Sequence, residues 1–349
     1  MKCTIQNIAD HLGLSRNTVS KALKNSSEVS ENTRNLVIKT ASKLGYKNAT
    51  FATPVIPASE TGSNGTILFL TRTYASDSEF WTTVLRGIES ILSNANYHLA
   101  ISIMSDSDLK QLNFPQTISD SSIKGIILVE ICDKVVCDAL SQFNLPIVSV
   151  DMPNVPFEEL NGIDVVTMES KKNLKKIINQ LIEKGAESFG FVGDLYSPNV
   201  RRGFQERYNA LSECLAEHQL PLNQKNCLLH QTPEDFRNFQ TTVNNLQAMI
   251  SLPDVFICGN DWTAIQLIYA LQFLGFQIPK DICVVGFDNI PAASRISPSL
   301  TTISTPQKYL GIAAARQILE RIQHPNCPHV FCQYETELII RNSTNITSF

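Results

Sequence analysis

The chain has 349 residues, 43% of them apolar and 18% charged, which allows a small domain joined to a body of one large or two medium domains. It contains no run of about twenty apolar residues that could span a membrane and no basic-then-apolar signal sequence, so we expect a cytoplasmic protein. The net charge of the chain is −4, yet residues 1–50 hold eight basic and three acidic side chains, a charge of +5. The remaining residues therefore carry −9, and a basic segment on an acidic chain indicates a local nucleic-acid-binding surface.

Residues 5–23 have the apolar spacing of two short helices joined by a tight turn. Gly13 is suited to end the first helix because glycine tolerates a positive φ, and Ser15 is placed to cap the second. Two helices joined so closely cross steeply, and the second can enter a DNA major groove. The positions predicted to face inward are Ile5, Ile8, Ala9, Leu12, Val19, Ala22 and Leu23.

The outer face of the second predicted helix bears donors that suit base edges. Arg16 and Lys21 can donate to guanine, and Asn17 can make a paired contact with adenine; Ser20 shares this face. A solvated polar face is the alternative, but the position directly after a capped turn favours contact with bases. A third helix is expected from Ser30, with an inner face formed by Leu36, Val37, Thr40, Ala41 and Leu44.

The body is predicted to alternate strands and helices, which indicates parallel sheets covered on both faces. Apolar runs predict strands in two successive groups, and the repeated pattern favours two α/β lobes with a cleft between them. Asp151, Asn260 and Asp288 stand at the carboxyl ends of such strands, where open α/β sheets bind ligands. The predicted strands are 66–71, 98–104, 124–130 and 145–151, followed by 188–194, 227–230, 254–260 and 282–288.

The nine cysteines are scattered, mostly in apolar contexts, as expected of reduced thiols. One segment, HPNCPHVFC, places His324, Cys327, His329 and Cys332 close together. These residue types can bind zinc, but a proline-bearing loop entering a strand points alternate side chains to opposite faces. We therefore expect no metal site and no cofactor.

Two stretches resemble one family. TIQNIADHLGLSRNTVSKALKNSSEVSENTRNLVIKTASKLGY, residues 4–46, is similar to the DNA-binding head of the lactose-repressor (LacI/GalR) family. Residues 256–322, with CGND, GFDNIP and SPSLTTISTP in order, resemble the regulatory core of the same family, which has the periplasmic-binding-protein fold. The resemblance implies an all-α three-helix helix-turn-helix head joined to a two-lobed α/β core.

The resemblance also implies DNA contacts at ten positions of the head. Arg16, Asn17 and Lys21 fall on base-contacting positions, and the others mainly on phosphate-contacting ones. The ten residues are Thr4, Ser15, Arg16, Asn17, Ser20, Lys21, Lys24, Ser30, Thr33 and Tyr46.

The linker departs from the family pattern. Its two prolines, two glycines and small polar residues mark an inter-domain linker, where family members form a hinge helix on DNA. Here Pro54 stands where helix-compatible residues are usual, and Val55 replaces the usual leucine wedge. Because an interior proline costs a helix about 3 kcal/mol, we expect a weak, shifted or absent hinge helix.

An effector pocket is implied by alignment to the family. Carboxylates, an amide and a guanidinium beside aromatic faces suit a polyhydroxylated ring. Phe80 and Trp81 are expected on the loop after the first strand, and Ala210 replaces a glycine usual three residues after Arg207. The implied effector contacts are Phe80, Trp81, Asp151, Arg207, Phe236, Asn260 and Asp288.

The sequence thus predicts an operator-specific transcriptional regulator, a repressor that binds near-palindromic DNA as a homodimer, with a tetramer also open, and responds to a sugar or sugar derivative. A regulator controlled by a phosphorylated carrier protein or a purine corepressor is the alternative, and a non-enzymatic sugar-binding receptor is a more distant one. No enzyme motif is present, so we expect no catalysis. The expected domains are a head (1–47), a linker (48–65) and a core (66–341), with lobe 1 at about 66–159 plus 290–321 and lobe 2 at about 160–289 plus 322–341.

Overall fold

The structure is a computed structural model of the whole chain. It describes residues 4–23, 29–30, 33, 36–37, 40–41, 63–72, 78–131, 133–151, 153, 155–195, 202–230 and 238–346. The chain divides into two compact units, Met1–Gly62 and Ser63–Phe349.

The head begins with the two helices that the apolar spacing predicts, α1 (Ile5–Leu12) and α2 (Arg16–Leu23). Thr4 and Asn7 form a reciprocal capping box at the start of α1. Gly13 ends α1 with a left-handed φ of 64°, as glycine permits. The Ser15 hydroxyl accepts the backbone N–H of Thr18 at 3.0 Å, which confirms the predicted cap of α2.

A small apolar core holds the head together. The fully buried side chains of α1 and α2 meet those of the helical residues Val37 and Ala41, all at 1% exposure or less. Leu36 is expected on the same inner face, but its side chain is 50% exposed. Consecutive residues of a helix are about 100° apart around its axis, so Leu36 faces away from the side on which Val37 is buried. The buried residues of this core are Ile8, Ala9, Val19, Ala22, Val29, Val37 and Ala41.

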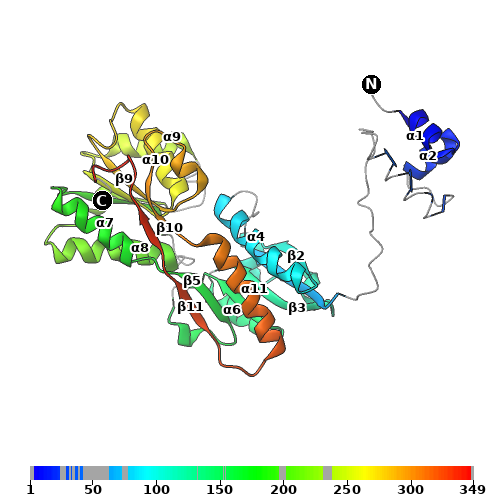
Figure 1. Cartoon of the computed structure of the whole chain (residues 1–349). Helices are drawn as coiled ribbons and strands as arrows, with labels where there is room; N and C mark the ends of the chain where they lie inside the picture. The colour runs from blue at the N-terminus through cyan, green and yellow to red at the C-terminus, as the bar shows by residue number, and fades with distance from the viewer. Residues whose placement is uncertain are drawn as a thin grey trace. The chain divides into compact units, whose positions relative to one another are not determined.

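The body contains two six-stranded sheets (Figure 1). The first is parallel throughout, with strand order β11-β5-β4-β3-β1-β2. Alternate side chains of β1 face opposite helical layers: Ile67 and Phe69 pack toward α4 and α11, and Leu68 and Leu70 toward α5 and α6. The strands are β1 (Gly65–Thr71), β2 (Tyr97–Ile103), β3 (Ile123–Val129), β4 (Ile147–Val150), β5 (Asp164–Met168) and β11 (Phe331–Tyr334). The helices are α4 (Glu79–Asn94), α5 (Asp106–Gln111), α6 (Lys134–Ser141) and α11 (Gln307–Gln323).

The second sheet has the order β12-β10-β9-β8-β6-β7, and only its β10–β12 pairing is antiparallel among the described strands. Phe189 and Phe191 pack toward α7 and α8, whereas Phe256 and Cys258 pack toward α9 and α10. The strands are β6 (Phe189–Asp194), β7 (Leu228–His230), β8 (Val255–Cys258), β9 (Cys283–Asp288), β10 (Thr301–Ser304) and β12 (Glu337–Ile339). The helices are α7 (Lys172–Glu183), α8 (Arg202–Glu217), α9 (Phe239–Ala248) and α10 (Asp261–Phe273). Short 3-10 turns are η2 (Gln116–Ser119), η3 (Phe157–Glu159), η4 (Gln224–Asn226) and η5 (Pro291–Ser294).

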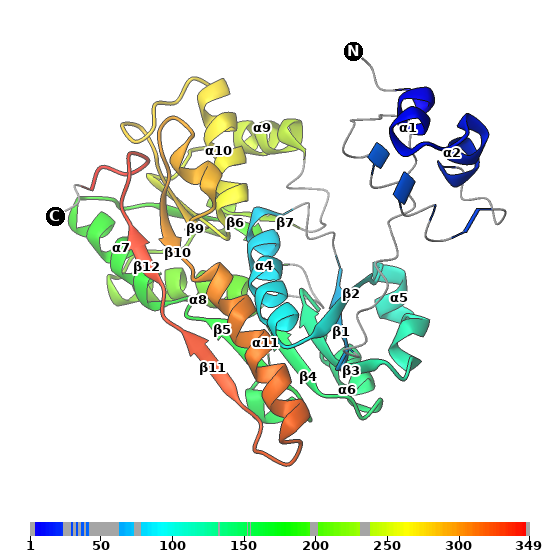
Figure 2. The same ribbon diagram turned by 45° about the vertical axis from the view of Figure 1, so that its right-hand side comes forward.

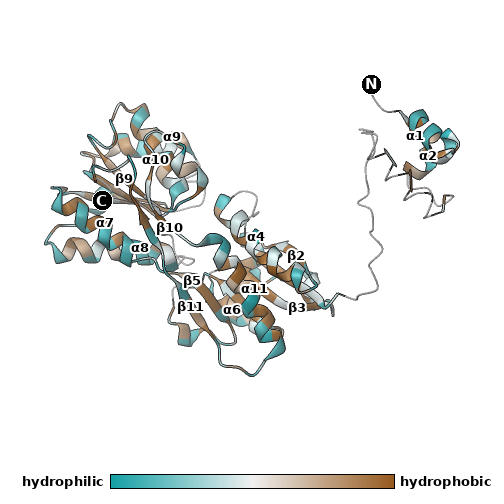
Figure 3. Cartoon of the chain, in the orientation of Figure 1, coloured by the Kyte–Doolittle hydropathy of each residue, from teal (hydrophilic) through white to brown (hydrophobic). Residues whose placement is uncertain are grey.

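The hydropathy pattern agrees with these layers. Figure 3 shows apolar strands inside both lobes and helices whose polar residues face outward. The two-lobed α/β core predicted from strand–helix alternation is therefore confirmed. In the part of the chain that the structure describes, no helix combines the length and apolarity needed to cross a bilayer.

The chain passes between the lobes three times, after β5, after β10 and after β11. These crossings differ from the expected lobe ranges. Residues 164–168 and 331–334 belong to the first sheet, and 301–304 to the second. The hydrophobic pattern reveals a strand but not its partner, and here the partner is set by backbone pairing such as Val148 with Asp164.

Helices α4 and α11 lie side by side on the first sheet (Figure 2). Their backbones approach closely at Gly87 and Gly311. A Cβ at Gly87 would overlap the carbonyl oxygen of Lys308, and one at Gly311 would overlap that of Val84. Two glycines therefore permit the contact that joins the helix after β1 to the helix after β10.

A buried ion pair connects the last turn of α11 to the first sheet. Arg321 Nη2 lies 2.8 Å from Asp164 Oδ1, and His329 Nδ1 lies 3.2 Å from the same oxygen. Burial alone would raise the pKa of Asp164, but the hydrogen bonds from Arg321 and from the Val330 N–H lower it below its usual value. His329, one of the residues weighed as a metal ligand, thus contacts a carboxylate of the first sheet. Among residues with a described placement, no three His, Cys, Asp or Glu side chains group as a metal site, and the cysteines are free thiols.

Candidate nucleic-acid interface and ligand site

The exposed face of α2 presents the predicted base-contacting residues. Arg16 and Asn17 are exposed in its first turn, and Ser20 and Lys21 are half-buried one turn later. Val19 and Ala22 fix the opposite face in the core. The helix therefore directs donors outward while its apolar side is anchored, as a helix in a major groove requires.

Three of the predicted phosphate contacts also shape helix starts. Thr4 and Ser15 cap α1 and α2, and Ser30 Oγ accepts the N–H of Thr33 at 3.4 Å. Their hydroxyls therefore lie beside exposed backbone N–H groups at helix starts, where anions bind favourably. The predicted contacts Lys24 and Tyr46, the aromatic Phe236 and linker residues 48–62, with Pro54 and Val55, lie outside the described residues.

Arg207 of α8 is the centre of the candidate ligand site. It is 3% exposed, and its Nη1 donates to the Gly259 carbonyl at 2.5 Å. The guanidinium carbon lies 3.5 Å from the centre of the Phe287 ring. Its Nε–H is buried without a partner among the described residues. A buried donor without a partner costs free energy, so this N–H is available to a bound molecule.

Carboxylates from both lobes influence the pKa of this arginine. Desolvation lowers the pKa of Arg207, and Asp288 and then Asp151 oppose that shift most strongly. Asp151 follows β4 in the first sheet and Asp288 ends β9 in the second. Two predicted residues from different lobes are therefore electrostatically coupled to Arg207.

The backbone at these strand ends is unusual. Asp151 has a φ of 90° and Asp288 a φ of 114°, both in the left-handed region that non-glycine residues rarely adopt. Glu130, directly after β3, has a φ of 60°. Strained residues of this kind concentrate at ligand sites. The register pairs Val129 with Val150, so Glu130 and Asp151 follow neighbouring positions of adjacent strands.

Asp261 anchors the turn that contains Asp288. Its Oδ2 accepts the N–H of Ile290 at 2.9 Å, and its Oδ1 accepts the Thr302 hydroxyl at 2.5 Å. Burial, and then the Asp288 carboxylate, raise the pKa of Asp261 to about 8. The predicted Asn260 precedes it as the N-cap of α10, and its side-chain oxygen accepts the Thr263 N–H at 2.9 Å.

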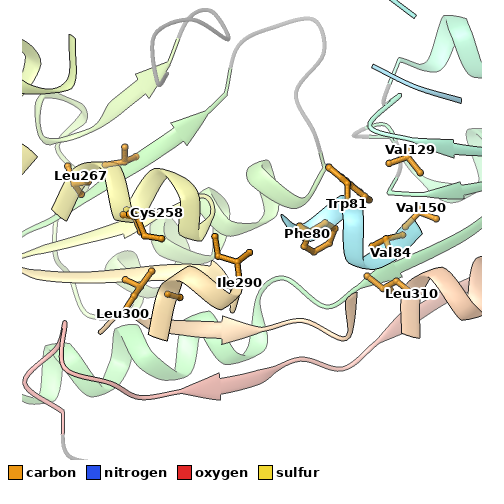
Figure 4. Close-up of a cluster of buried hydrophobic side chains, with 14 of the residues drawn as sticks. Phe80, Trp81, Val84, Val129, Val150, Cys258, Leu267, Ile290, Leu300 and Leu310 are labelled. Atoms are coloured by element: carbon orange, nitrogen blue, oxygen red, sulfur yellow. The ribbon is translucent and has the colours of Figure 1, made fainter. Parts of the chain in front are cut away.

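Phe80 and Trp81 are not on a loop as predicted but in the first turn of α4, which begins at Glu79 behind the Ser78 cap. Each is 7% exposed, and their rings meet edge to face at 4.6 Å. Figure 4 shows them between the second-lobe residue Ile290 and the first-lobe apolar side chains. The aromatic pair therefore lies where the lobes share one hydrophobic cluster.

Glu130 is the residue that sequence reasoning missed. Trp81 Nε1 donates to Glu130 Oε1 at 2.6 Å, and the glutamate is only 5% exposed. It ends the run KGIILVE, so the rule that selected Asp151 and Asp288 would have found it. A separate hollow of about 820 Å³ lies between η4, β7 and α9, and none of the predicted effector residues that the structure describes lines it.

Two family models match the chain. The model for bacterial regulatory proteins of the lacI family matches residues 4–48, and a periplasmic binding protein-like domain matches residues 178–344. Three related proteins are repressors or control proteins. They are the HTH-type transcriptional repressor PurR of Photobacterium profundum (26% identity; 97% of this chain, 98% of the relative), the ribose operon repressor of Haemophilus influenzae (28%; 97% and 98%) and catabolite control protein A of Staphylococcus xylosus (27%; 94% and 97%).

Solved structures share the fold, two of them over nearly the whole chain and one over 80% of it. A transcriptional regulator CelR–cellobiose complex matches with a TM-score of 0.69 and 20% identity over 98% of this chain and 100% of that one. The lac repressor dimer bound to operator and the anti-inducer ONPF matches with a TM-score of 0.67 and 18% identity over 99% of both chains. A LacI family regulator from Enterococcus faecium with bound ribose matches with a TM-score of 0.65 and 24% identity over 80% and 98%.

Proposed function

The chain belongs to the LacI family of bacterial regulatory proteins, and from that premise we propose that it is an operator-specific transcriptional repressor controlled by a small molecule. The head would bind operator DNA and the body would bind the effector. The protein would act in the bacterial cytoplasm, where the operator is, and would catalyse no reaction.

One observation supports DNA binding above the others. A capped helix, α2, is anchored through Val19 and Ala22 and exposes Arg16 and Asn17 in its first turn. The N-terminal residues of a recognition helix are those that meet base edges. Guanine and adenine offer the acceptors and donors that these two side chains match.

The chemistry around Arg207 favours a sugar or sugar derivative as the effector. Asp151, Asp288 and the buried arginine can accept from and donate to ring hydroxyls, and Phe80 and Trp81 add aromatic surface nearby. Related solved proteins bind cellobiose and ribose. An effector that binds one arrangement of the lobes more tightly than the other would shift the population toward that arrangement. Operator affinity would then change by at most the difference between the effector's affinities for the two arrangements.

A homodimer fits both the DNA and the body surface. Helix-turn-helix heads of this kind meet near-palindromic sites as pairs, and a solved relative is a dimer on its operator. Helix α10 exposes Tyr269 (43%) and Phe273 (69%), and the ring of Phe239 of α9 (37%) meets that of Phe273 edge to face at 5.8 Å. We place the dimer contact on this aromatic face (Tyr269, Phe273 and Phe239), because a second copy would bury it.

Operator binding is tested by mobility shift and footprinting on fragments upstream of the gene and its neighbours. We expect one protected, near-palindromic site whose affinity falls steeply with salt through counterion release. Arg16→Ala should cost about 1–3 kcal/mol at its base and relax the preference there. Gln6→Ala, an exposed change on α1, serves as the control. Absence of any specific retarded fragment would refute the proposed function.

A further inference from the structure

We infer that the effector site is built for an uncharged polyhydroxylated molecule and discriminates against sugar acids and sugar phosphates, with Glu130 as a third carboxylate of the site. The inference rests on the proposed function, because it names the class of molecule that the same site takes. It follows from the balance of charge around Arg207 and from the way each charge is held.

The positive charge of Arg207 is already balanced. Its guanidinium is coupled to Asp288 and Asp151, stacks on Phe287 and donates to the Gly259 carbonyl. An anionic ligand needs a cation whose charge is not compensated. Arg207 instead offers its buried Nε–H, a donor whose hydrogen bond a neutral hydroxyl oxygen can accept.

Two further cations among the described residues, Arg202 and Arg341, are engaged elsewhere. Arg202, one turn before Arg207 on α8, has its Nε 2.7 Å from Glu206 Oε1 and donates to the Val155 carbonyl at 3.1 Å. Arg341 donates to the Leu300 carbonyl at 2.8 Å and to Asn289 Oδ1 at 2.6 Å. Neither guanidinium is left to offer the paired donors that a carboxylate or phosphate prefers.

Glu130 adds negative charge on the first-lobe side. Its side chain is 5% exposed and accepts the Trp81 indole N–H at 2.6 Å. The β3–β4 register places it beside Asp151, since Val129 pairs with Val150. Asp151 and Asp288 are thus coupled to Arg207, and Glu130 stands at the neighbouring strand end beside Asp151. In a poorly solvated site, like charges repel more strongly than in water, so an added anion is disfavoured.

The experiment uses Trp81 as the reporter. The chain has two tryptophans, and Trp262→Phe leaves Trp81 as the single indole beside the site. The full-length protein is titrated with matched neutral and anionic compounds: ribose and ribose 5-phosphate, glucose with glucuronate and glucose 6-phosphate, galactose and galacturonate, and cellobiose and cellobionate. Fluorescence and thermal shift give a Kd for each compound.

We expect a saturable signal from at least one neutral compound, with its anionic counterpart at least tenfold weaker, about 1.4 kcal/mol. Glu130→Gln removes the charge but retains an acceptor for the Trp81 indole, so it should narrow the anion-to-neutral ratio of Kd values severalfold. Asp120→Asn makes the same charge change before the start of β3, away from Glu130 at its end, and should leave the ratio unchanged.

Equal or tighter binding of an anionic partner would overturn the inference. The inference would also be overturned if no neutral compound changed the fluorescence or the unfolding temperature while operator binding is intact. Loss of operator binding itself would instead refute the proposed function, so the two failures are distinguishable. Even if Glu130→Gln fails to fold, the ratio of Kd values that the wild-type protein shows for anionic and neutral compounds tests whether the site discriminates against anions.

Discussion

Arg207 combines burial, a stacked guanidinium and a donor without a partner among the described residues. These features leave the arginine poorly satisfied unless another molecule is bound. A group of this kind contributes more to ligand affinity than to the stability of the empty body. The site at residue scale is therefore defined by incomplete hydrogen bonding as much as by residue type.

Arg207→Ala should remove effector-induced stabilisation and leave operator binding of the empty protein in place. A ligand at a hundred times its Kd stabilises the folded state by about 2.7 kcal/mol, and the variant should lose most of this gain. Thermal unfolding with and without the effector measures it. Arg86→Ala, an exposed change on α4, should retain the full shift; an undiminished shift in Arg207→Ala would exclude this arginine from the site.

Asp261 makes stability depend on pH. Its pKa is about 8 in the folded body against 3.8 for an ordinary aspartate carboxyl, so the folded state binds this proton more tightly than the unfolded state does. The resulting stabilisation is complete below the unfolded pKa and is lost as pH rises from about 4 through 8. Asp261→Asn stays neutral and keeps a donor and an acceptor for Thr302 and Ile290.

We therefore expect the unfolding temperature of the wild-type protein to fall between pH 6 and pH 9 and the Asp261→Asn profile to be flatter. Glu89→Gln changes an exposed carboxyl on α4 and should reproduce the wild-type slope. Parallel profiles for wild type and Asp261→Asn would show that this carboxyl does not titrate in that range.

At the scale of elements, the contact between α4 and α11 links the aromatic pair Phe80 and Trp81 to the segment that returns from the second lobe. The helices touch through backbone because Gly87 and Gly311 lack side chains. At such a backbone contact, no flexible side chain can move aside to make room for added atoms. It therefore fixes the position of the first turn of α4 relative to the first sheet.

Gly311→Ala should destabilise the body although alanine favours helix by about 1 kcal/mol. The added methyl would overlap the Val84 carbonyl, and overpacking costs about 1–3 kcal/mol, so a net loss of about 1 kcal/mol or more is expected in urea unfolding. Arg316→Ala on the exposed side of α11 should change stability by less than about 0.5 kcal/mol. A stabilised Gly311→Ala would mean that the helices separate at no cost.

Sequence reasoning located elements better than it located partners. Apolar runs predicted β1, β3, β8 and β9 within one or two residues, because burial leaves a local signature. They could not tell that β5 and β11 complete the first sheet, because pairing is a non-local property. Among the site residues, Phe80 and Trp81 were placed in a loop because the Ser78 cap and Glu79 were overlooked.

The position of Asp151 and Asp288 at strand ends follows from the sequence pattern, but their coupling to Arg207 does not. It depends on how two lobes meet, and no periodicity within either lobe specifies that. Glu130 has the same local signature at the end of its strand, but its contact with Trp81, 49 residues away, is not visible in the sequence. The family resemblance supplied Arg207, which hydrophobic spacing alone treats as one more helical residue.

At the scale of the whole molecule, the dimer would make two weak head–DNA contacts act together. Each head alone meets one half-site, and linking two heads raises the effective concentration of the second. The aromatic face of α10 and α9 is the surface that would provide this link. Its disruption should reduce operator affinity without touching either the head or the site around Arg207.

Tyr269→Glu with Phe273→Glu should convert the dimer to monomers, because burying two carboxylates in an apolar contact is costly. Sedimentation velocity should report the lower mass, and operator affinity should fall about a hundredfold or more. The effector thermal shift should persist. Lys280→Glu, an acidic change at an exposed position beyond α10, controls for charge; an unchanged sedimentation coefficient in the double variant would place the dimer contact elsewhere.

The strands β11 and β12 follow one another within residues 331–339, and each completes the edge of a different sheet. During translation, both sheets therefore remain incomplete until residues 331–339 have been synthesised. Neither lobe can complete its sheet before the other. A nascent body would expose two unfilled edges at once, which are sites for chaperones and for misassembly. A premature stop codon before Phe331 would accordingly damage both lobes together and leave no half of the body intact.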